Sequence, residues 1–315
     1  MKLSLVVPCY NEQGNVPLFY EAVKNDFDGV DFDYEIVFVN DGSSDGTSAE
    51  LKNLLSGEIP VKIVNFSRNF GKEAAMYAGL EQAAGDYVTI IDADLQQRPS
   101  IALEMARILD EEPEYDCVAA YQESRKEGGF MTFMKKSFYR AANAFTEIEL
   151  MPDASDFRTF RRNMVESILS LKENFRFSKG LFTWVGYNTK YLPYVVEERA
   201  TGESKWSFKK LLAYGLEGVI SFTTFPLRFP VYLGAAGILS SLVYLIVSLA
   251  LRFGSHHALT AMNAVITLIL FFGGALLMSV GVLGEYLARV YVQTKGRPIY
   301  IAKEILTNEE EGKNG

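Results

Sequence analysis

Two long uncharged segments in the C-terminal third constrain this chain more than any other feature. Residues 229–251 and 261–284 contain no charged side chain. Each segment is longer than the roughly 20 residues that an α-helix needs to cross about 30 Å of hydrocarbon. A soluble protein would have to bury both helices in one small domain. We therefore expect a transmembrane hairpin over 229–292, with spans at about 229–251 and 261–288.

The cations that flank these segments predict their orientation. Lys205, Lys209, Lys210 and Arg228 precede the first segment, Arg289, Lys295 and Arg297 follow the second, and the loop 252–260 carries Arg252 alone. Loops rich in lysine and arginine stay in the cytoplasm. The apolar run at 3–7 is too short for a signal peptide. The sequence therefore predicts a multi-pass protein of the cell (inner, cytoplasmic) membrane with both termini in the cytosol.

Apolar strands alternate with segments of helical period in the first 121 residues. We expect strands at 3–7, 35–40, 61–66, 87–91 and 117–121, and helices at 16–27, 47–56, 72–84 and 101–110. This order, with strands that are apolar on both faces, predicts an α/β fold with a doubly wound, mostly parallel sheet. The expected organisation is a cytosolic domain over 1–206, an amphipathic juxtamembrane helix over 207–228, the hairpin, and a cytosolic tail over 293–315.

Polar residues follow two of the expected strands directly. Asp92, Asp94 and Gln96 come after the strand at 87–91, and Asp41 comes after the strand at 35–40. Ligands of open α/β sheets bind outside the carboxyl ends of the strands. Carboxylate and amide oxygens suit Mg²⁺ or Mn²⁺ carrying a diphosphate, although Asp94 could instead cap the next turn. A carboxylate in the position of Asp41 could accept an N–H group of a nucleobase.

Composition excludes several other kinds of chemistry. The formal net charge of −8 argues against a nucleic-acid partner. His256 and His257, the two histidines of the chain, lie in the loop expected to face outward, so a general base in the cytosolic domain has to be a carboxylate. Cys9 and Cys117 fall at the ends of expected strands and should be reduced thiols.

Four motifs in order resemble those of a known family. They are VPCYNE at 7–12, NDGSSD at 40–45, NFGK at 69–72 and DADLQ at 92–96. The chain is similar to family 2 glycosyltransferases with the GT-A fold, and within them to the polyprenyl-phosphate glycosyltransferases, which include dolichol-phosphate mannose synthase and the bactoprenol glucosyltransferases. GESKWS at 202–207, TFPLR at 224–228 and GEY at 284–286 extend the resemblance over nearly the whole chain.

The resemblance implies roles for residues of the donor site. Asp41 would hold the base, Asp92 would lie at the ribose or diphosphate, and Asp94 with Gln96 would hold Mg²⁺ or Mn²⁺. Further donor ligands would be Pro8, Tyr10, Glu12, Lys72, Ala93 and Lys205. For Lys205 two other interpretations stay open, a clamp on the acceptor phosphate and an interfacial lysine.

The resemblance also implies an acceptor site among the cations between 124 and 162. Arg125, Lys135 and Arg158 would bind the acceptor phosphate, for which arginine offers bidentate geometry. Asp156 matches the carboxylate that the family places beside the acceptor, with a helix cap as the alternative. A phosphate monoester has its second pKa near 6, so Asp156 could orient the acceptor rather than deprotonate it.

The implied activity is transfer of a sugar from a nucleotide-diphosphate donor, UDP-glucose or a related UDP-sugar, to undecaprenyl (polyprenyl) phosphate for modification of cell-envelope glycans. One displacement would invert the anomeric centre. The implied partners are the donor, the lipid, the membrane and further copies of the chain, with a tetramer as one candidate. Alternatives are a GDP-mannose-dependent mannosyltransferase and a catalytically silent scaffold that binds nucleotide sugars beside a membrane partner. Two spans are too few for the pore of a processive synthase.

Overall fold

The computed structural model describes residues 1–122, 151, 154–195 and 261–308, with single positions between 227 and 246. The chain forms two compact units. The first consists of Met1–Ser221 and Pro298–Gly315, and the second of Phe222–Arg297. The first unit thus receives chain from both sides of the second. Each unit is described by itself below.

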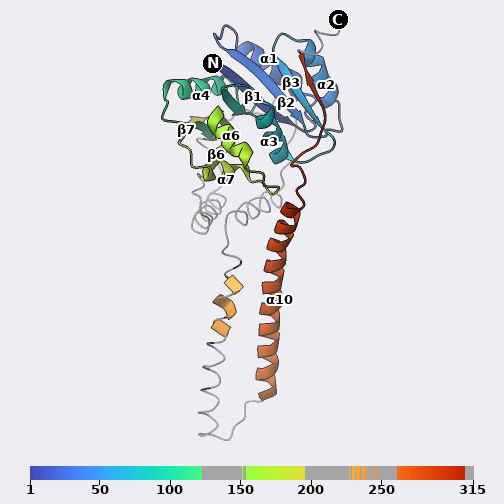
Figure 1. The fold of residues 1–315 in the computed structure, drawn as a ribbon, viewed down its shortest axis with the longest axis vertical. Coiled ribbons are helices and arrows are strands. Elements are labelled where there is room, and N and C mark those ends of the chain that lie inside the picture. The colour runs from blue at the N-terminus through green and yellow to red at the C-terminus, as the bar shows by residue number, and fades with distance from the viewer. Residues whose placement is uncertain are drawn as a thin grey trace. The chain divides into compact units, whose positions relative to one another are not determined.

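One mixed sheet forms the centre of the first unit, with strand order β7-β5-β6-β4-β1-β2-β3-β8 (Figure 1). The strands are β1 (Lys2–Cys9), β2 (Asp33–Asn40), β3 (Val61–Phe66), β4 (Tyr87–Ile90), β5 (Cys117–Gln122), β6 (Ala154–Arg161), β7 (Thr189–Tyr194) and β8 (Ala302–Thr307). Within the described part of the chain, only β6 and β8 run against the other six. The predicted α/β class is confirmed.

Helices cover both faces of this sheet. One face carries α1 (Asn15–Asp26), α2 (Thr47–Asn53), a 3₁₀ turn (Leu54–Ser56) and α4 (Pro99–Glu111) over one hydrophobic core. The other carries α3 (Lys72–Gln82), α6 (Arg162–Ser170) and α7 (Ser178–Trp184) over a second core. Alternate residues of each central strand enter opposite cores, because side chains of a strand point to opposite faces. The central strands are therefore mostly apolar on both faces.

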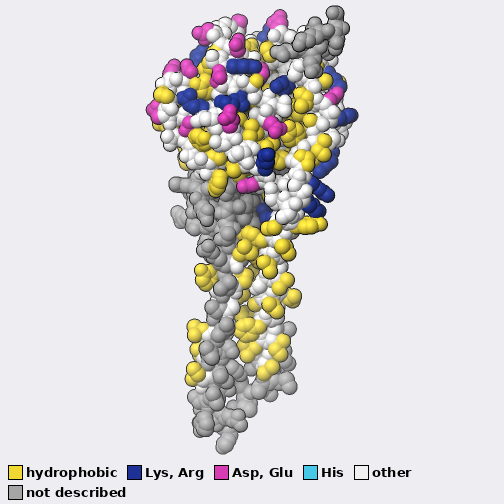
Figure 2. Space-filling view, viewed as in Figure 1, with side chains coloured by type: hydrophobic (Ala, Val, Ile, Leu, Met, Phe, Trp, Pro, Cys, Tyr) yellow, Lys and Arg dark blue, Asp and Glu magenta, His cyan; other side chains and the backbone are white. Residues whose placement is uncertain are grey.

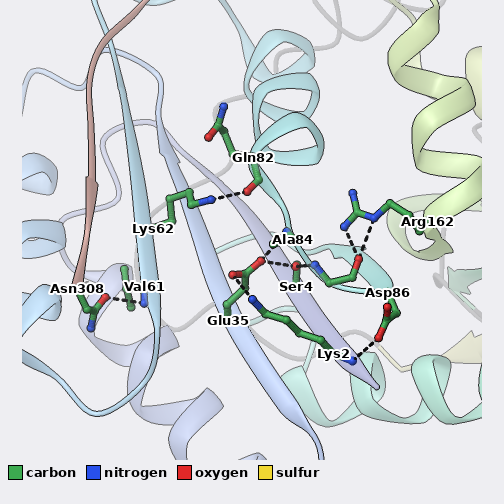
Figure 3. Close-up of polar contacts among 11 residues, drawn as sticks. Lys2, Ser4, Glu35, Val61, Lys62, Gln82, Ala84, Asp86, Arg162 and Asn308 are labelled. Carbon is green, nitrogen blue, oxygen red and sulfur yellow. Dashed lines mark hydrogen bonds and ion pairs between the residues drawn. The ribbon is translucent and has the colours of Figure 1, made fainter. Parts of the chain in front are cut away.

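A polar network fastens the amino-terminal ends of the strands (Figure 3). Glu35 Oε1 accepts hydrogen bonds from Ser4 Oγ at 2.6 Å and from the Ala84 amide at 2.7 Å, and Glu35 Oε2 accepts one from Lys2 Nζ at 2.9 Å. The Lys2 amide donates to Asp86 Oδ2 at 2.8 Å. Burial alone would raise the pKa of Glu35, but these donors outweigh it and hold the pKa below its ordinary value.

Three strands and one helix were not expected from the sequence. The unexpected elements are β6, β7, β8 and α7. Asp156 lies within β6, six positions before α6 begins at Arg162, so the interpretation of Asp156 as a helix cap is wrong. The strand β8 lies in the segment expected to be a tail, where it pairs antiparallel with β3. The helices and strands that were expected in the first 121 residues agree with the structure to within a few residues at each end.

The second unit contains the long helix α10 (Ala261–Thr294). Its 34 residues give it a length of about 51 Å. The part Phe271–Thr294 is long and apolar enough to cross a membrane by length and composition. Leu276 and Leu277 are 66% and 75% exposed, and Figure 2 shows hydrophobic side chains along the described part of the helix. Such exposure of large apolar side chains requires an apolar environment.

Two observations within the second unit bear on the expected hairpin. Gly237 is helical and buried, and a Cβ atom there would lie 2.3 Å from Cε1 of Phe272 on α10. The segment around Gly237 therefore packs closely against α10 through a small residue. Near the end of α10, Arg289 Nη2 lies 3.5 Å from Glu285 Oε1, so these two residues form an ion pair one turn apart. Of the first expected span only single positions between 229 and 246 are described, and of the helix expected over 207–228 only residue 227 is described. The loop 252–260 lies outside the described residues.

Candidate active site

Three loops meet at the carboxyl ends of neighbouring parallel strands. They follow β1, β2 and β4, which lie side by side in the order β4-β1-β2. Because these strands are parallel, the loops that leave them emerge at one edge of the sheet. That edge is opposite the Glu35 network. The predicted donor residues in the described part of the chain lie on these loops, at the end of β1 or at the start of α3.

The loops after β1 and β2 are joined by hydrogen bonds. The Asn11 amide donates to Ser43 Oγ at 3.0 Å, and Asn11 Oδ1 accepts the Ser44 amide at 2.9 Å. The Glu12 amide donates to Thr47 Oγ1 at 2.8 Å. Asn11 has a φ of +54°, a conformation that asparagine tolerates better than most residues. Beside it, the predicted donor ligand Tyr10 is 41% exposed, so its ring is available to a ligand. Pro8 and Glu12 are half-buried.

Asp41 fastens the loop after β2 to the loop after β3. Its carboxylate accepts the amides of Phe70 at 2.6 Å and Gly71 at 2.9 Å. The residue is 3% exposed, and burial raises the pKa of its carboxyl despite these two donors. Each carboxylate oxygen can accept a second hydrogen bond. The observed role of Asp41 is therefore to shape the loop, and its contact with a nucleobase stays a prediction.

The loop after β4 carries the Asp92, Asp94 and Gln96 side chains on a strained backbone. Leu95 has a φ of +59°, which is unfavourable for a bulky side chain and is found where surrounding structure imposes it. The Gln96 amide donates to Asp94 Oδ1 at 3.2 Å, so Asp94 does stabilise a local turn. Its second oxygen is not needed for that bond. The turn and a ligand role for Asp94 are therefore compatible.

Gln97 is a supporting residue that sequence reasoning missed. It is 7% exposed, its Oε1 accepts the Asp92 amide at 3.2 Å, and its Nε2 donates to Ser155 Oγ at 3.3 Å. It thereby ties the loop after β4 to β6. In the sequence, Gln97 is only one more amide next to the motif at 92–96, and no pattern distinguishes it from a surface residue. Its role depends on the pairing of β4 with β6.

Lys72 brings together two carboxylates from different strands. Strand β6 is antiparallel to β4, with Arg158 opposite Ile90. Asp92 lies two residues after Ile90 and Asp156 lies two residues before Arg158, so both aspartates lie at the same end of this strand pair. Like charges that lie close together repel. Lys72, the first residue of α3, lies between them, with Nζ 2.7 Å from Asp92 Oδ1 and 3.4 Å from Asp156 Oδ2. Asp92, Asp156 and Lys72 therefore form one charged cluster.

Lys72 and Asp156 keep their charges at neutral pH. Burial by itself would lower the pKa of Lys72, but the carboxylates of Asp92 and Asp156 outweigh it and raise that pKa above its ordinary value. Burial would raise the pKa of Asp156, yet Lys72, Lys179 and Arg158 lower it overall. Asp156 Oδ1 is buried and has no hydrogen-bond partner among the described residues. This oxygen of the ionised carboxylate can therefore accept a hydrogen bond from a ligand or bind a cation.

Arg158, a predicted ligand of the acceptor phosphate, lies in the protein interior. It is 3% exposed, its Nε donates to Ser155 O at 3.0 Å, and its guanidinium lies 5.3 Å from the centre of the Phe182 ring. Its positive charge helps to lower the pKa of Asp156. Direct contact with a phosphate stays a prediction. The other predicted phosphate ligands, Arg125, Lys135 and Lys205, lie outside the described residues.

The donor set after β4 fits a hard divalent cation. Asp92 and Asp94 offer carboxylate oxygens and Gln96 an amide oxygen, all on partly exposed side chains. Mg²⁺ and Mn²⁺ prefer such ligands. No group of three or more His, Cys, Asp or Glu residues in the described part of the chain could hold a metal ion. A cation here would therefore take further ligands from the substrate, which is usual for Mg²⁺ bound to phosphates. Ala93, between the two aspartates, is buried.

Comparison with known proteins identifies relatives of nearly equal length. The sequence model of the family "Glycosyl transferase family 2" matches residues 4–169. CsbB of Bacillus subtilis (strain 168) is 41% identical over 303 residues, 96% of this chain and 91% of that protein. The prophage bactoprenol glucosyl transferase homolog of Escherichia coli (strain K12) is 36% identical over 309 residues, 97% of this chain and 99% of that protein. Mannosyl-3-phosphoglycerate synthase from Rubrobacter xylanophilus, a solved structure, has a TM-score of 0.49 and 19% identity over 70% of this chain and 72% of that one.

Proposed function

Because the chain belongs to glycosyl transferase family 2, we propose that it is a metal-dependent inverting glycosyltransferase that transfers glucose, or a related sugar, from a UDP-sugar to undecaprenyl (polyprenyl) phosphate. The observation that carries the proposal is the contact of Lys72 with both Asp92 and Asp156. Asp92 belongs to the predicted donor motif and Asp156 to the predicted acceptor side. Their shared lysine supports one site in which donor and acceptor meet.

The reaction in this site needs no proton transfer. Above a pH of about 6 the acceptor phosphate is mostly a dianion, so one of its oxygens can attack the anomeric carbon directly. The bond from that carbon to the donor diphosphate breaks, and its electron pair leaves with the nucleoside diphosphate. Asp156 is held ionised and orients the acceptor instead of acting as a base. Attack from the face opposite the leaving group inverts the anomeric centre.

Lys72 and the loop after β4 would serve the leaving group. Lys72 stays protonated beside Asp92, and 37% of its side chain is exposed, so a bound diphosphate can share its charge. A divalent cation bound by Asp94 and Gln96 would neutralise the charge that develops on the diphosphate. The polar loop after β2 would bind the nucleoside, with Asp41 in reach of the base. Preorganised charges of this kind stabilise a transition state because they need no reorganisation.

The course of the chain supports a membrane hairpin with the first unit on one side. Strands β1 to β7 precede α10, and β8 follows it, yet β8 pairs with β3 in the same sheet. A chain that leaves a domain and returns to it crosses a membrane an even number of times. If α10 crosses once, a second crossing has to lie before it, in the uncharged residues 229–251. The close packing of Gly237 on Phe272 agrees with a second helix there.

Cysteine labelling tests this topology. Ser255→Cys, in the loop 252–260, should react with a membrane-impermeant maleimide in intact cells. Ser170→Cys, exposed on the first unit, should react only after the cells are permeabilised. Background should be low because Cys9 and Cys117 are buried, and burial raises the pKa of Cys117 to about 11. Equal labelling of both variants in intact cells would contradict the hairpin.

A transfer assay tests the activity. Purified protein in detergent is incubated with undecaprenyl phosphate, Mg²⁺ or Mn²⁺, and each of a panel of radiolabelled UDP- and GDP-sugars, and the label in the organic phase is counted. We expect transfer from UDP-glucose, lost with EDTA, with Asp94→Asn and with Asp156→Asn, and kept with Asp33→Asn at the far end of β2. Transfer from GDP-mannose instead would show that the proposed donor is wrong and that the chain is a mannosyltransferase. Binding of nucleotide sugars without any transfer would favour a scaffold.

A further inference from the structure

A chain of buried amides links the C-terminal strand to the loop after β2. Glu304 on β8 accepts a hydrogen bond through Oε1 from Asn65 Nδ2 at 3.0 Å. Asn65 Oδ1 accepts one from Asn40 Nδ2 at 2.8 Å. Asn40 Oδ1 accepts the Ser43 amide at 3.1 Å. The path therefore runs from β8 through β3 and β2 to the loop that the proposed function assigns to the nucleoside.

Glu304 at one end and the Ser43 amide at the other set the direction of every bond in this chain. A carboxylate only accepts hydrogen bonds, so Asn65 has to turn its NH₂ group toward Glu304 and its oxygen toward Asn40. Asn40 then has to turn its NH₂ group toward Asn65, which leaves its oxygen for the Ser43 amide. Asn40 and Asn65 are 4% and 5% exposed, so water cannot replace a lost partner. In such buried networks one change of polarity affects every member.

The Ser43 amide is at the centre of the loop geometry. Ser43 lies two residues after Asp41, and its Oγ accepts the Asn11 amide from the loop after β1 at 3.0 Å. A reversed Asn40 side chain would point an NH₂ group at the Ser43 amide, where two donors would face each other. The loop would then move away from the geometry that holds Asp41 and Asn11 together. Glu304 therefore acts on the nucleoside loop without touching a ligand.

We propose that Glu304 is a positioning residue for nucleotide binding, which acts through Asn65 and Asn40 on the loop 41–46. This inference rests on the proposed function, because it assigns the loop to the donor. It places a determinant of donor affinity on the strand that follows the apolar helix α10, far along the chain from the donor motifs. Glu304 also pairs with Lys52 on α2, with Lys52 Nζ 3.1 Å from Oε1, so the ion pair has to be separated from the amide chain by experiment.

Matched variants separate these two contacts. Glu304→Gln can still present an oxygen to Asn65 but loses the ion pair, and Lys52→Met loses the ion pair alone. Glu304→Ala removes the acceptor, and Glu304→Lys replaces it with a donor. Glu304 is on an edge strand and its side chain is 36% exposed, so each variant should fold. The full chain in detergent is used throughout.

The first measurement is UDP affinity by calorimetry, followed by kcat and the two KM values. We expect Glu304→Ala and Glu304→Lys to weaken UDP binding and raise the donor KM about tenfold, the effect of one lost interaction of ordinary strength. The kcat at saturating donor and the acceptor KM should stay within about twofold. Glu304→Gln and Lys52→Met should resemble the wild type. Unchanged UDP affinity in Glu304→Ala, or equal losses in Glu304→Gln and Glu304→Ala, would overturn the inference.

Amide hydrogen exchange provides a second readout that general destabilisation does not reproduce. In Glu304→Ala the loop 41–46 should exchange faster, while α4 and β4 exchange as in the wild type. Faster exchange throughout the first unit would mean that Glu304 serves only stability, and would overturn the inference. Absence of nucleotide binding by the wild type would contradict the proposed function itself, and with it the inference about Glu304. Binding by the wild type that Glu304→Ala leaves unchanged would contradict the inference alone.

Discussion

The ammonium group of Lys72 lies 2.7 Å from the carboxylate of Asp92 and 3.4 Å from that of Asp156, and its charge allows the two carboxylates to lie close together. Asp92 lies in the loop after β4, and Asp156 lies on β6. The first residue of α3 is then well placed to bridge them. A helix N-terminus adds a favourable field for nearby carboxylates.

Replacing Lys72 by methionine should therefore lower kcat, in addition to any effect on the binding of the donor. We expect a loss of about 100-fold, the usual effect of removing one preorganised charge from a reacting centre. Lys72→Arg should recover most of the rate because it keeps the charge. Lys190→Met is a matched control. Lys190 lies in β7, and its Nζ atom forms an ion pair with Glu112 Oε1 at 2.6 Å. A wild-type kcat for Lys72→Met would contradict the role given to the cluster.

Asp156→Asn should separate acceptor chemistry from donor binding. The buried Oδ1 atom has no partner in the described part of the chain, and the neighbouring cations keep the carboxylate ionised. We expect kcat to fall about 100-fold or more, with UDP affinity unchanged by calorimetry. Ser155→Ala, one residue away on the opposite face of β6, should lose far less activity. A large loss of UDP affinity in Asp156→Asn would place the residue in the donor site instead.

Glu35 should make stability depend on pH at the far end of the sheet. Its folded pKa lies below the unfolded value of about 4.5. Its contribution is thus fully present above pH 4.5 and is lost as the pH falls through the folded pKa. Glu35→Gln leaves donors unpaired and should cost about 2 kcal/mol near neutral pH, or roughly 4 to 8 °C in Tm.

Thermal unfolding of the Glu35 variant and the wild type between pH 3.5 and 7 checks this expectation. The difference in Tm should be largest near pH 7 and should narrow below about pH 4.5. Glu104→Gln, on the exposed face of α4, should leave Tm nearly unchanged across the range. A Tm difference for Glu35→Gln that grows as the pH falls would show the opposite sign and would contradict the buried network.

An element can be predicted from the sequence when the interactions that define it are local, and not when its partners are distant along the chain. Strands β1 to β4 are apolar on both faces because helices cover both faces, and that pattern is local. Strand β6 contains Asp156, Arg158 and Arg161, and Arg161 is satisfied by the carbonyl of Tyr115, which only the folded chain brings near. Strand β8 is an edge strand with alternating exposure, so its pattern is weak.

The same distinction separates the predicted from the missed parts of the site. Asp92, Asp94 and Gln96 follow one another in a motif, so they could be found without the fold. The approach of Asp156 to Lys72 depends on the antiparallel register of β4 and β6, and the contact of Glu304 with Asn65 depends on β8 returning to the sheet. The second contact joins residues 239 positions apart, and no local pattern encodes either contact.

Gly42 offers a test of how closely two of the loops have to approach. Its φ is +64°, and a Cβ atom there would lie 2.5 Å from the carbonyl carbon of Arg68 and 2.6 Å from the amide nitrogen of Asn69. Gly29 has a similar φ of +70° with no atom within 4 Å of such a Cβ. Both Gly→Ala variants carry the strain of a left-handed residue, about 1 kcal/mol. Only Gly42→Ala also pushes the loop after β2 away from the backbone at 68–69.

We therefore expect Gly42→Ala to lower Tm more than Gly29→Ala and to raise the donor KM, because the loop that carries Asp41 and Ser43 has to shift. Gly29→Ala should lower Tm slightly and leave the donor KM unchanged. Thermal unfolding and initial rates over a range of donor concentrations measure both effects. If the two variants had the same donor KM, the close approach at Gly42 would matter for folding alone, and the loop after β2 would not shape the nucleotide site.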